Sequence, residues 1–199
     1  MTESTRELDP AAKDVLFREA HSAFAFEDAE VTDQQLQEIY ALTRLSPTAV
    51  NSTPLRVVFV RSDEAKARLL PLLAEGNRVK SASASATAIL AADLGFLDQM
   101  GVLAPHIADP SAFFPDEQAI EQAAMFNATL QAGAFILAVR TLGLDAGPMN
   151  GIDTAGIDVE FLAAAQWRSF MVVNIGWATA AGTRPRGARL EFASAARII

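Results

Sequence analysis

The feature that most constrains the fold is a long apolar stretch in the second half of the chain. Residues 119–144 are the most apolar long window of the chain, but Glu121, Arg140 and several amides and hydroxyls interrupt it. A membrane crossing would place these polar groups in hydrocarbon, which is costly. Gly143 stands where a left-handed residue usually caps a helix. We therefore predict one long buried helix, from Glu117 to Leu142, as the central rod of the core.

Two shorter helices precede this rod. Thr32 and Gln35 have the spacing of a capping box, so a helix is predicted to begin there and to end by Leu45. The Ser46-Pro47 pair supports that end, because proline disfavours helix in the residue before it. A second helix is expected over residues 63–74, shortened or kinked by Pro71.

Three apolar runs of strand length predict a sheet. The first, LRVVFVR at residues 55–61, is apolar on both faces and is interpreted as a central strand. The second is TAILAA at 87–92 and the third FMVVNIGWA at 170–178. The polar stretch at 76–85, the proline-rich excursion at 95–115 and the turn LDAGPMNGID at 144–153 separate them, and a short helix is expected near 159–165.

This order of elements predicts an α+β fold, a small mixed sheet flanked by helices with a long central helix. A length of 199 residues suits one domain, 1–199, and no repeat or hinge-like linker divides it. Residues 1–14 are expected to be a flexible N-terminal extension, and residues 182–199 a basic and then apolar C-terminal tail.

Composition excludes several functions. With 24 acidic residues against 16 basic ones, the net charge of -8 argues against nucleic-acid binding. The absence of cysteine removes disulfides, thiolate metal sites, iron–sulfur ligation and thiol nucleophiles. The polar, acidic start lacks the pattern of a secretory signal, so a cytoplasmic protein without a membrane segment is expected.

Familiar catalytic motifs are also missing. The two histidines, His21 and His106, are far apart in sequence, so no histidine-based metal site is expected. The chain contains no G-x-S-x-G nucleophile elbow, no G-x-G-x-x-G fingerprint and no P-loop. What is left is a set of polar, turn-rich segments. Taken singly, Pro47, Asn51 and Asn77 are ordinary turn formers.

The order of these segments is more informative than any one of them. SPTAVNSTPLRVVFV follows a capped helix, GNRVK precedes the second strand, and AMFNATLQAG lies in the long helix. GLDAGPMNGID and VVNIGWA follow, before the basic tail. Together they resemble the nitroreductase family of flavoenzymes. From Leu16 to Phe192, including APH at 104–106 and RLEFASA near the end, the chain is most similar to the malonic semialdehyde reductase branch.

The resemblance implies a nitroreductase-like homodimer that holds FMN in clefts between its subunits. Hydride from NADH or NADPH would pass through flavin N5 to a small electrophile, malonic semialdehyde (3-oxopropanoate), a nitro compound or a quinone. No side chain of the chain itself is expected to be catalytic, and no metal is expected. Lys80 would support the reduced flavin electrostatically.

The resemblance also assigns residues to parts of the cofactor. Asn77 and Lys80 would meet the pyrimidine edge and ribityl chain, and the segment 148–151 would face N5 and O4. The phosphate would lie with the basic tail and the early polar motif, and a further stretch would reach the flavin from the partner subunit. The cofactor-binding residues expected in full are His21, Ser22, Pro47, Thr48, Asn51, Asn77, Lys80, Pro148, Met149, Asn150, Gly151, Arg186 and Arg189.

The chain departs from the family pattern at two places. The early motif reads His21-Ser22 where the family has an arginine, and Phe126 stands where relatives of this branch carry arginine before Asn127. These changes leave a second hypothesis open, a flavin-poor or non-redox dimeric ligand-binding relative of the same fold. On the substrate side we expect Phe96, Phe113 and Phe114. Arg56 is the candidate cation for the carboxylate of an aldehyde acid, or equally a surface residue at the end of a strand.

Overall fold

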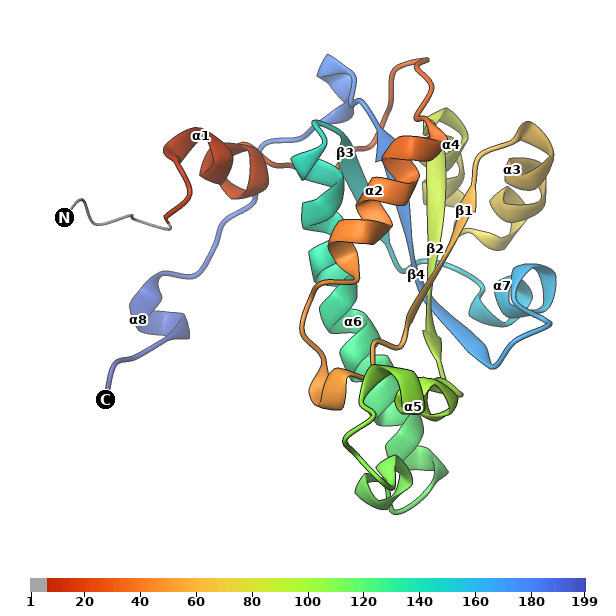
Figure 1. The fold of residues 1–199 in the computed structure, drawn as a ribbon. Helices are drawn as coiled ribbons and strands as arrows, with labels where there is room; N and C mark the ends of the chain where they lie inside the picture. The colour runs from red at the N-terminus through yellow and green to blue at the C-terminus, as the bar shows by residue number, and fades with distance from the viewer. Residues whose placement is uncertain (1–6) are drawn as a thin grey trace.

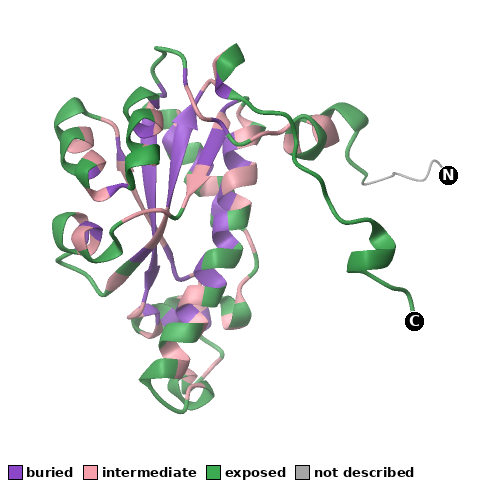
Figure 2. Cartoon of the chain, turned by 180° about the vertical axis from the view of Figure 1, so that it is seen from behind, coloured by how far each residue is buried: buried purple, intermediate pink, exposed green. Residues whose placement is uncertain are grey.

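The long helix α6 is the central element of the computed structural model, which describes residues 7–199 (Figure 1). It spans Glu117–Thr141, capped at its start by Asp116, whose carboxylate accepts from the Ala119 amide. Gly143 follows with a φ of 71°, the left-handed position that favours glycine. Helix α6 is the one helix of the described residues that is long and apolar enough to cross a membrane. Here its buried side packs on the sheet and its other side is exposed (Figure 2).

Four strands form one sheet in the order β1-β2-β4-β3. Every neighbouring pair is antiparallel, so the predicted mixed sheet is wrong and the sheet is purely antiparallel. Whether a sheet is mixed depends on the direction of each strand relative to its neighbours. The prediction lacked strand β3, so the neighbours could not be assigned correctly. The strands are β1 Leu55–Val60, β2 Ala86–Asp93, β3 Asp145–Met149 and β4 Trp167–Gly176.

The two faces of the sheet bury different side chains, as the two-residue period of a strand requires. In β2, Ala88 and Leu90 pack towards α6 and α2, whereas Ile89 packs in a second cluster with Leu69 and Ile157. Helices therefore cover both faces, with α2 and α6 on one side and α3 and α7 on the other (Figure 1).

Strand β1 is an edge strand, not the central strand that was predicted. It is apolar on both faces because Val57 and Phe59 pack on the α6 side and Val58 and Val60 on the α3 side. Burial of both faces thus does not identify a central strand when helices cover both sides of the edge.

Strand β3 was missed, because its sequence DAGPM has the glycine and proline of a turn. Pro148 is tolerated there because β3 is the other edge strand of the sheet. The side of an edge strand that has no neighbour makes no hydrogen bonds to another strand, so a proline costs none there. Gly147 is required by packing, since a Cβ at that position would lie 2.6 Å from the Ala23 carbonyl oxygen.

The helices follow the sequence signals more closely. Helix α2 begins after Thr32 with both hydrogen bonds of the capping box. The polar stretch at 76–85 is in fact mostly helix α4, and α7 begins earlier than predicted because Asp153 caps it. The remaining bounds are α1 Pro10–Lys13, α2 Asp33–Thr43, α3 Asp63–Leu69, α4 Glu75–Ser83, α5 Met100–Leu103, α7 Thr154–Phe161 and α8 Phe192–Ala195.

The two ends of the chain extend from the same side of the body (Figure 1). Residues 1–6 of the expected N-terminal extension lie outside the described residues, and α1 lies within the rest of it. The tail after Gly182 contains α8 and leaves Leu190, Phe192 and Ile198 exposed.

Candidate functional site

A basic hollow lies between the N-terminal segment, residues 16–24, and the C-terminal tail, residues 184–189. It has a volume of about 470 Å³ and lies beside the C-terminal end of α6. We call it the arginine hollow, because its lining includes four arginines and no carboxylate. Four predicted phosphate residues line it, together with two arginines that the prediction did not name. The polar residues of the lining are His21, Ser22, Arg140, Arg184, Arg186 and Arg189.

Two of these arginines are also structural. Arg186 donates through Nη2 to the carbonyl oxygens of Phe17, Arg18 and Ala20, at 3.0, 2.8 and 2.7 Å, and so fastens the tail to the N-terminal segment. Arg140 donates to the Leu16 carbonyl oxygen at 3.2 Å. The tail and the N-terminal segment therefore form one wall of the hollow.

The charge in the hollow is only partly balanced. Burial lowers the pKa of the Arg140 guanidinium, the Asp145 carboxylate raises it, and the nearby Arg186 charge lowers it again. A cation whose pKa is lowered by burial and by a like charge is stabilised by an anion. Guanidinium groups are the preferred donors for phosphate and carboxylate oxygens, so the hollow suits an anionic ligand group.

A second group of predicted residues lies where α4 meets the segment after β3. Lys80 donates through Nζ to Asn77 Oδ1 at 3.2 Å, and Asn77 donates through Nδ2 to the Gly151 carbonyl oxygen at 3.1 Å. A Cβ at position 151 would lie 2.9 Å from Asn77 Nδ2, so only glycine leaves this contact undisturbed. Asn77, Lys80 and Gly151 therefore lie together.

Phe24 connects the two groups. The Lys80 Nζ lies 4.9 Å from the centre of its ring, and the Arg184 Cζ lies 4.7 Å from the same centre. Both contacts are within the range of cation–π attraction. A row of contacting residues thus leads from Gly151 through Asn77, Lys80 and Phe24 to Arg184 in the arginine hollow.

Pro148 and Met149 end strand β3, and Asn150 and Gly151 follow directly. The Ala23 amide donates to the Ala146 carbonyl oxygen at 3.0 Å, which places the segment around residue 23 alongside β3. The start of β3 therefore lies beside the segment that lines the hollow, and Gly151, just after the end of β3, lies beside Asn77.

Pro47, Thr48 and Asn51 lie elsewhere in the chain. The Ala49 amide donates to Asn127 in the middle of α6, and Asn51 donates to the Leu103 carbonyl oxygen of α5. Arg140 is 13 residues further along α6, which corresponds to roughly 20 Å at the rise of a helix. Within one chain, this stretch does not meet the arginine hollow.

Sequence reasoning missed Arg140, Arg184 and Phe24 as residues of this surface. Arg184 belongs to the basic tail that was noted, so its charge was the available signal. In the sequence, Arg140 is an ordinary cation in the last turn of a helix, a position that the helix dipole alone would favour. Phe24 gives no sequence signal, because only the fold places its ring between two cations.

Two of the residues expected on the substrate side have other contacts within this chain. Arg56 is engaged by Asp93, with Nη2 2.6 Å from the carboxylate, so it is not a free cation for a substrate acid. Phe96 is buried in the core, where its ring contacts Phe114 edge-on. Of the three aromatic residues expected there, Phe113 is the exposed one.

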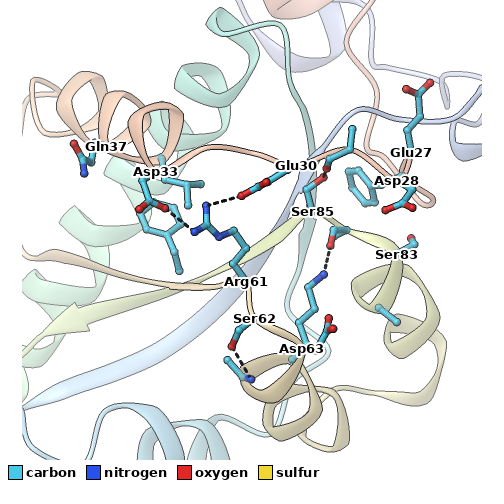
Figure 3. A pocket seen from close by; sticks show the side chains of 18 of the residues that line it. Glu27, Asp28, Glu30, Asp33, Gln37, Arg61, Ser62, Asp63, Ser83 and Ser85 are labelled. Atoms are coloured by element: carbon cyan, nitrogen blue, oxygen red, sulfur yellow. Dashed lines mark hydrogen bonds and ion pairs between the residues drawn. The ribbon is translucent and has the colours of Figure 1, made fainter.

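A larger hollow, of about 1160 Å³, lies between α2, α3 and α4 (Figure 3). It contains none of the predicted residues, and acidic side chains surround it. Its two cations are engaged, Arg61 by Asp33 at 2.8 Å and Lys66 by the Ala84 carbonyl oxygen at 2.6 Å. This hollow therefore does not suit an anionic cofactor. Between residues 7 and 199, no group of three metal-ligating side chains is found.

Comparisons with known proteins point to one family. The model of the nitroreductase family matches residues 18–177. A protein of Leptothrix cholodnii named "Putative NADH dehydrogenase/NAD(P)H nitroreductase" is 45% identical over 98% of this chain and 100% of its own length. A protein of the same name from Streptomyces griseus is 50% identical over 93% of this chain and 94% of its own length.

Two solved structures show the same fold. A nitroreductase of Exiguobacterium sibiricum, described as being in complex with FMN, has a TM-score of 0.83 at 21% identity and covers 97% of this chain and 98% of its own. The ydfN protein of Bacillus subtilis has a TM-score of 0.81 at 24% identity, over 95% of this chain and 99% of its own. At this identity the likeness establishes the fold alone.

Proposed function

Because the chain belongs to the nitroreductase family, we propose that it is an FMN-dependent NAD(P)H oxidoreductase that passes hydride to a small electrophile. The observation that carries the proposal is the surface from Gly151 past Lys80 to the arginine hollow. The relatives named above support NADH or NADPH as the donor, and the Exiguobacterium structure supports FMN.

The residues present fit FMN. Its phosphate carries almost two negative charges at neutral pH and needs cationic donors. Arg184 and Arg189 line the hollow beside His21 and Ser22, and the lining has no carboxylate to repel the phosphate. The arginine expected at position 21 is absent, and Arg140 supplies a cation to the same hollow.

Lys80 and Asn77 would hold the ring system. Bound FMN would supply hydride transfer through its N5 atom, and the protein would supply position and charge. Lys80 places a cation where negative charge develops on reduction, and its hydrogen bond to Asn77 fixes its direction. Pro148, Met149 and Asn150 would approach the ring along the end of β3, and Gly151 leaves room for the main chain there.

A second copy of the chain would complete the site. Pro47, Thr48 and Asn51 do not reach the hollow of their own chain, so they would contact the flavin held by the partner. Large apolar side chains on the outer side of α6 and on the tail support such a dimer, because one copy leaves them in water. These exposed residues are Phe126, Leu130, Leu190, Phe192, Ile198 and Ile199.

For the natural electrophile, we propose malonic semialdehyde, a nitro compound or a quinone. The similarity to the malonic semialdehyde reductase branch favours a small aldehyde acid, and the names of the relatives favour nitro compounds. An aldehyde acid needs a free cation for its carboxylate, and Arg56 is already paired with Asp93. A panel with malonic semialdehyde, a nitroarene and a quinone, each with NADH and with NADPH, distinguishes these substrates.

The test of the proposed function compares FMN with riboflavin, which lacks the phosphate. Flavin fluorescence gives the Kd of each for the apoprotein. We expect FMN to bind at least tenfold more tightly, and Arg184→Ala to remove most of that difference while riboflavin binding changes little. Protein that is colourless and takes up neither flavin would instead support the non-redox dimeric ligand-binding relative. Equal Kd values for the two flavins would overturn the assignment of the arginine hollow.

A further inference from the structure

The segment between α2 and β1 has an unusual backbone. Val50, Asn51 and Thr53 have φ angles of 50°, 57° and 37°, and they are the non-glycine residues of positive φ among residues 7–199. A β-branched residue such as valine or threonine is a genuine outlier in this region. Such a conformation persists only where the surroundings hold it, and it occurs most often at functional sites.

Two side chains of α6 hold the ends of this segment. Asn127 Oδ1 accepts from the Ala49 amide at 2.7 Å, and Gln131 Oε1 accepts from the Leu55 amide at 3.0 Å. Asn127 also donates through Nδ2 to the Ala123 carbonyl oxygen at 2.9 Å, which fixes which way its amide points. The strained residues lie between these two anchors.

Asn127 and Gln131 are buried in an otherwise apolar stripe of α6, with exposures of 3% and 2%. Their neighbours on the same side, Ala124, Ala128 and Ala132, are all fully buried in the main core. A buried amide is costly unless it is hydrogen-bonded, and an apolar side chain would fill this space without that cost. Core packing alone therefore does not account for two amides one helical turn apart.

Contacts inside the segment complete the arrangement. Thr48 Oγ1 accepts from the Thr53 amide at 3.0 Å, and Arg56 donates to the Thr53 carbonyl oxygen at 2.9 Å. Arg56 is itself held by Asp93. These contacts tie the segment to β1, whereas Asn127 and Gln131 tie it to the helix that carries the exposed Phe126 and Leu130.

We propose that Asn127 and Gln131 are positioning residues, which hold Val50, Asn51 and Thr53 in the left-handed conformation in which their stretch meets the flavin bound by the second copy. The inference rests on the proposed function, since it names how this chain prepares the stretch that the partner's site needs. A segment held in place before binding spares the ordering cost at the moment of binding. Loss of either anchor should therefore weaken FMN binding without any contact to FMN being removed.

The first experiment measures the segment without flavin. Hydrogen exchange of the amides of residues 49–55 is followed by mass spectrometry in the apoprotein, for wild type, Asn127→Leu and Gln131→Leu. We expect exchange of this segment to rise at least tenfold in both variants. Thr43→Val is the control, because it removes another buried hydrogen bond, to the Ile39 carbonyl oxygen, and keeps both anchors of residues 49–55. Unchanged exchange in both leucine variants would overturn the proposal.

The second experiment measures the Kd of FMN by fluorescence and tests whether a second substitution restores FMN binding. Asn127→Leu should raise this Kd at least fivefold, and Thr43→Val should leave it near the wild-type value. Adding Val50→Gly to Asn127→Leu should recover much of the loss, because glycine adopts positive φ without steric cost. A role in core packing alone predicts no rescue, and that result would contradict the proposal. Should Asn127→Leu fail to fold, Gln131→Leu with Val50→Gly gives the same decision.

The two possible failures are distinguishable. Wild-type protein that binds no FMN defeats the proposed function and, with it, the flavin half of this inference. The exchange measurement needs no flavin, so it still decides whether the two amides hold the segment. Faster exchange with an unchanged Kd of FMN in both leucine variants would leave the proposed function standing and overturn the inference alone.

Discussion

Lys80 is the residue with the most direct chemical task in the proposed site. It is half-buried, and its ammonium group is directed by Asn77 and by the ring of Phe24. We predict that Lys80→Ala slows flavin reduction by NAD(P)H at least about tenfold, less than the ~10²–10³ loss at a fully buried donor. Stopped-flow absorbance measures this rate, and thermal melting shows whether the fold is kept.

Lys66→Ala is the control for Lys80, since Lys66 donates to the Ala84 carbonyl oxygen at the unrelated acidic hollow. Its reduction rate should match that of wild type. Equal rates for the Lys80 variant and its parent would show that residue 80 has no electrostatic role.

Gly151 offers a second test at the scale of one residue. An added Cβ would lie 2.9 Å from Asn77 Nδ2, so Gly151→Ala should break the hydrogen bond that directs Asn77 and Lys80. We predict at least fivefold weaker FMN binding. Gly76→Ala, one residue from Asn77, meets nothing within 4 Å and should bind FMN as wild type does. Calorimetry on both variants makes the comparison, and similar losses in the two would count against the geometry.

His21 lines the arginine hollow at the position where the family has an arginine. We predict that His21→Arg lowers the Kd of FMN, because a guanidinium is a permanent cation and a preferred donor for phosphate oxygens. Fluorescence titration of both proteins makes the comparison, and an unchanged Kd would show that residue 21 does not meet the phosphate.

At the scale of the element, the cap of α2 is the most readable feature of the sequence. Thr32 accepts from the Gln35 amide at 3.2 Å, and Gln35 accepts from the Thr32 amide at 2.9 Å. We predict that Thr32→Ala lowers the free energy of unfolding by about 1 kcal/mol. Urea unfolding measures it, and a change below about 0.3 kcal/mol would mean that the cap contributes little beyond the packing of α2.

Elements with local signals were predictable, and elements defined by their neighbours were not. The capping box and Gly143 mark the ends of α2 and α6 because caps depend on adjacent residues. Strand β3 was hidden by Gly147 and Pro148, whose use at a sheet edge depends on which strand lies beside it. The edge position of β1 was missed for the same reason.

The same division holds for the site. The order of the segments indicated Asn77, Lys80 and Gly151 through a family resemblance, and the structure brings these three together. No local pattern could place Arg140 in the hollow, because its position there depends on the packing of the tail against the N-terminal segment. The positive φ angles of Val50 and Thr53 were equally invisible, since neither residue type favours them.

At the scale of the whole molecule, we propose that a second copy of the chain completes the flavin site. Sedimentation velocity with detection at 280 nm and in the flavin band, on protein saturated with FMN, tests it directly. We predict that flavin absorbance sediments with a species of twice the 21.2 kDa chain mass, at one FMN per chain. Flavin bound to a single chain, or a dimer that carries no flavin, would exclude a flavin site shared by two copies of the chain.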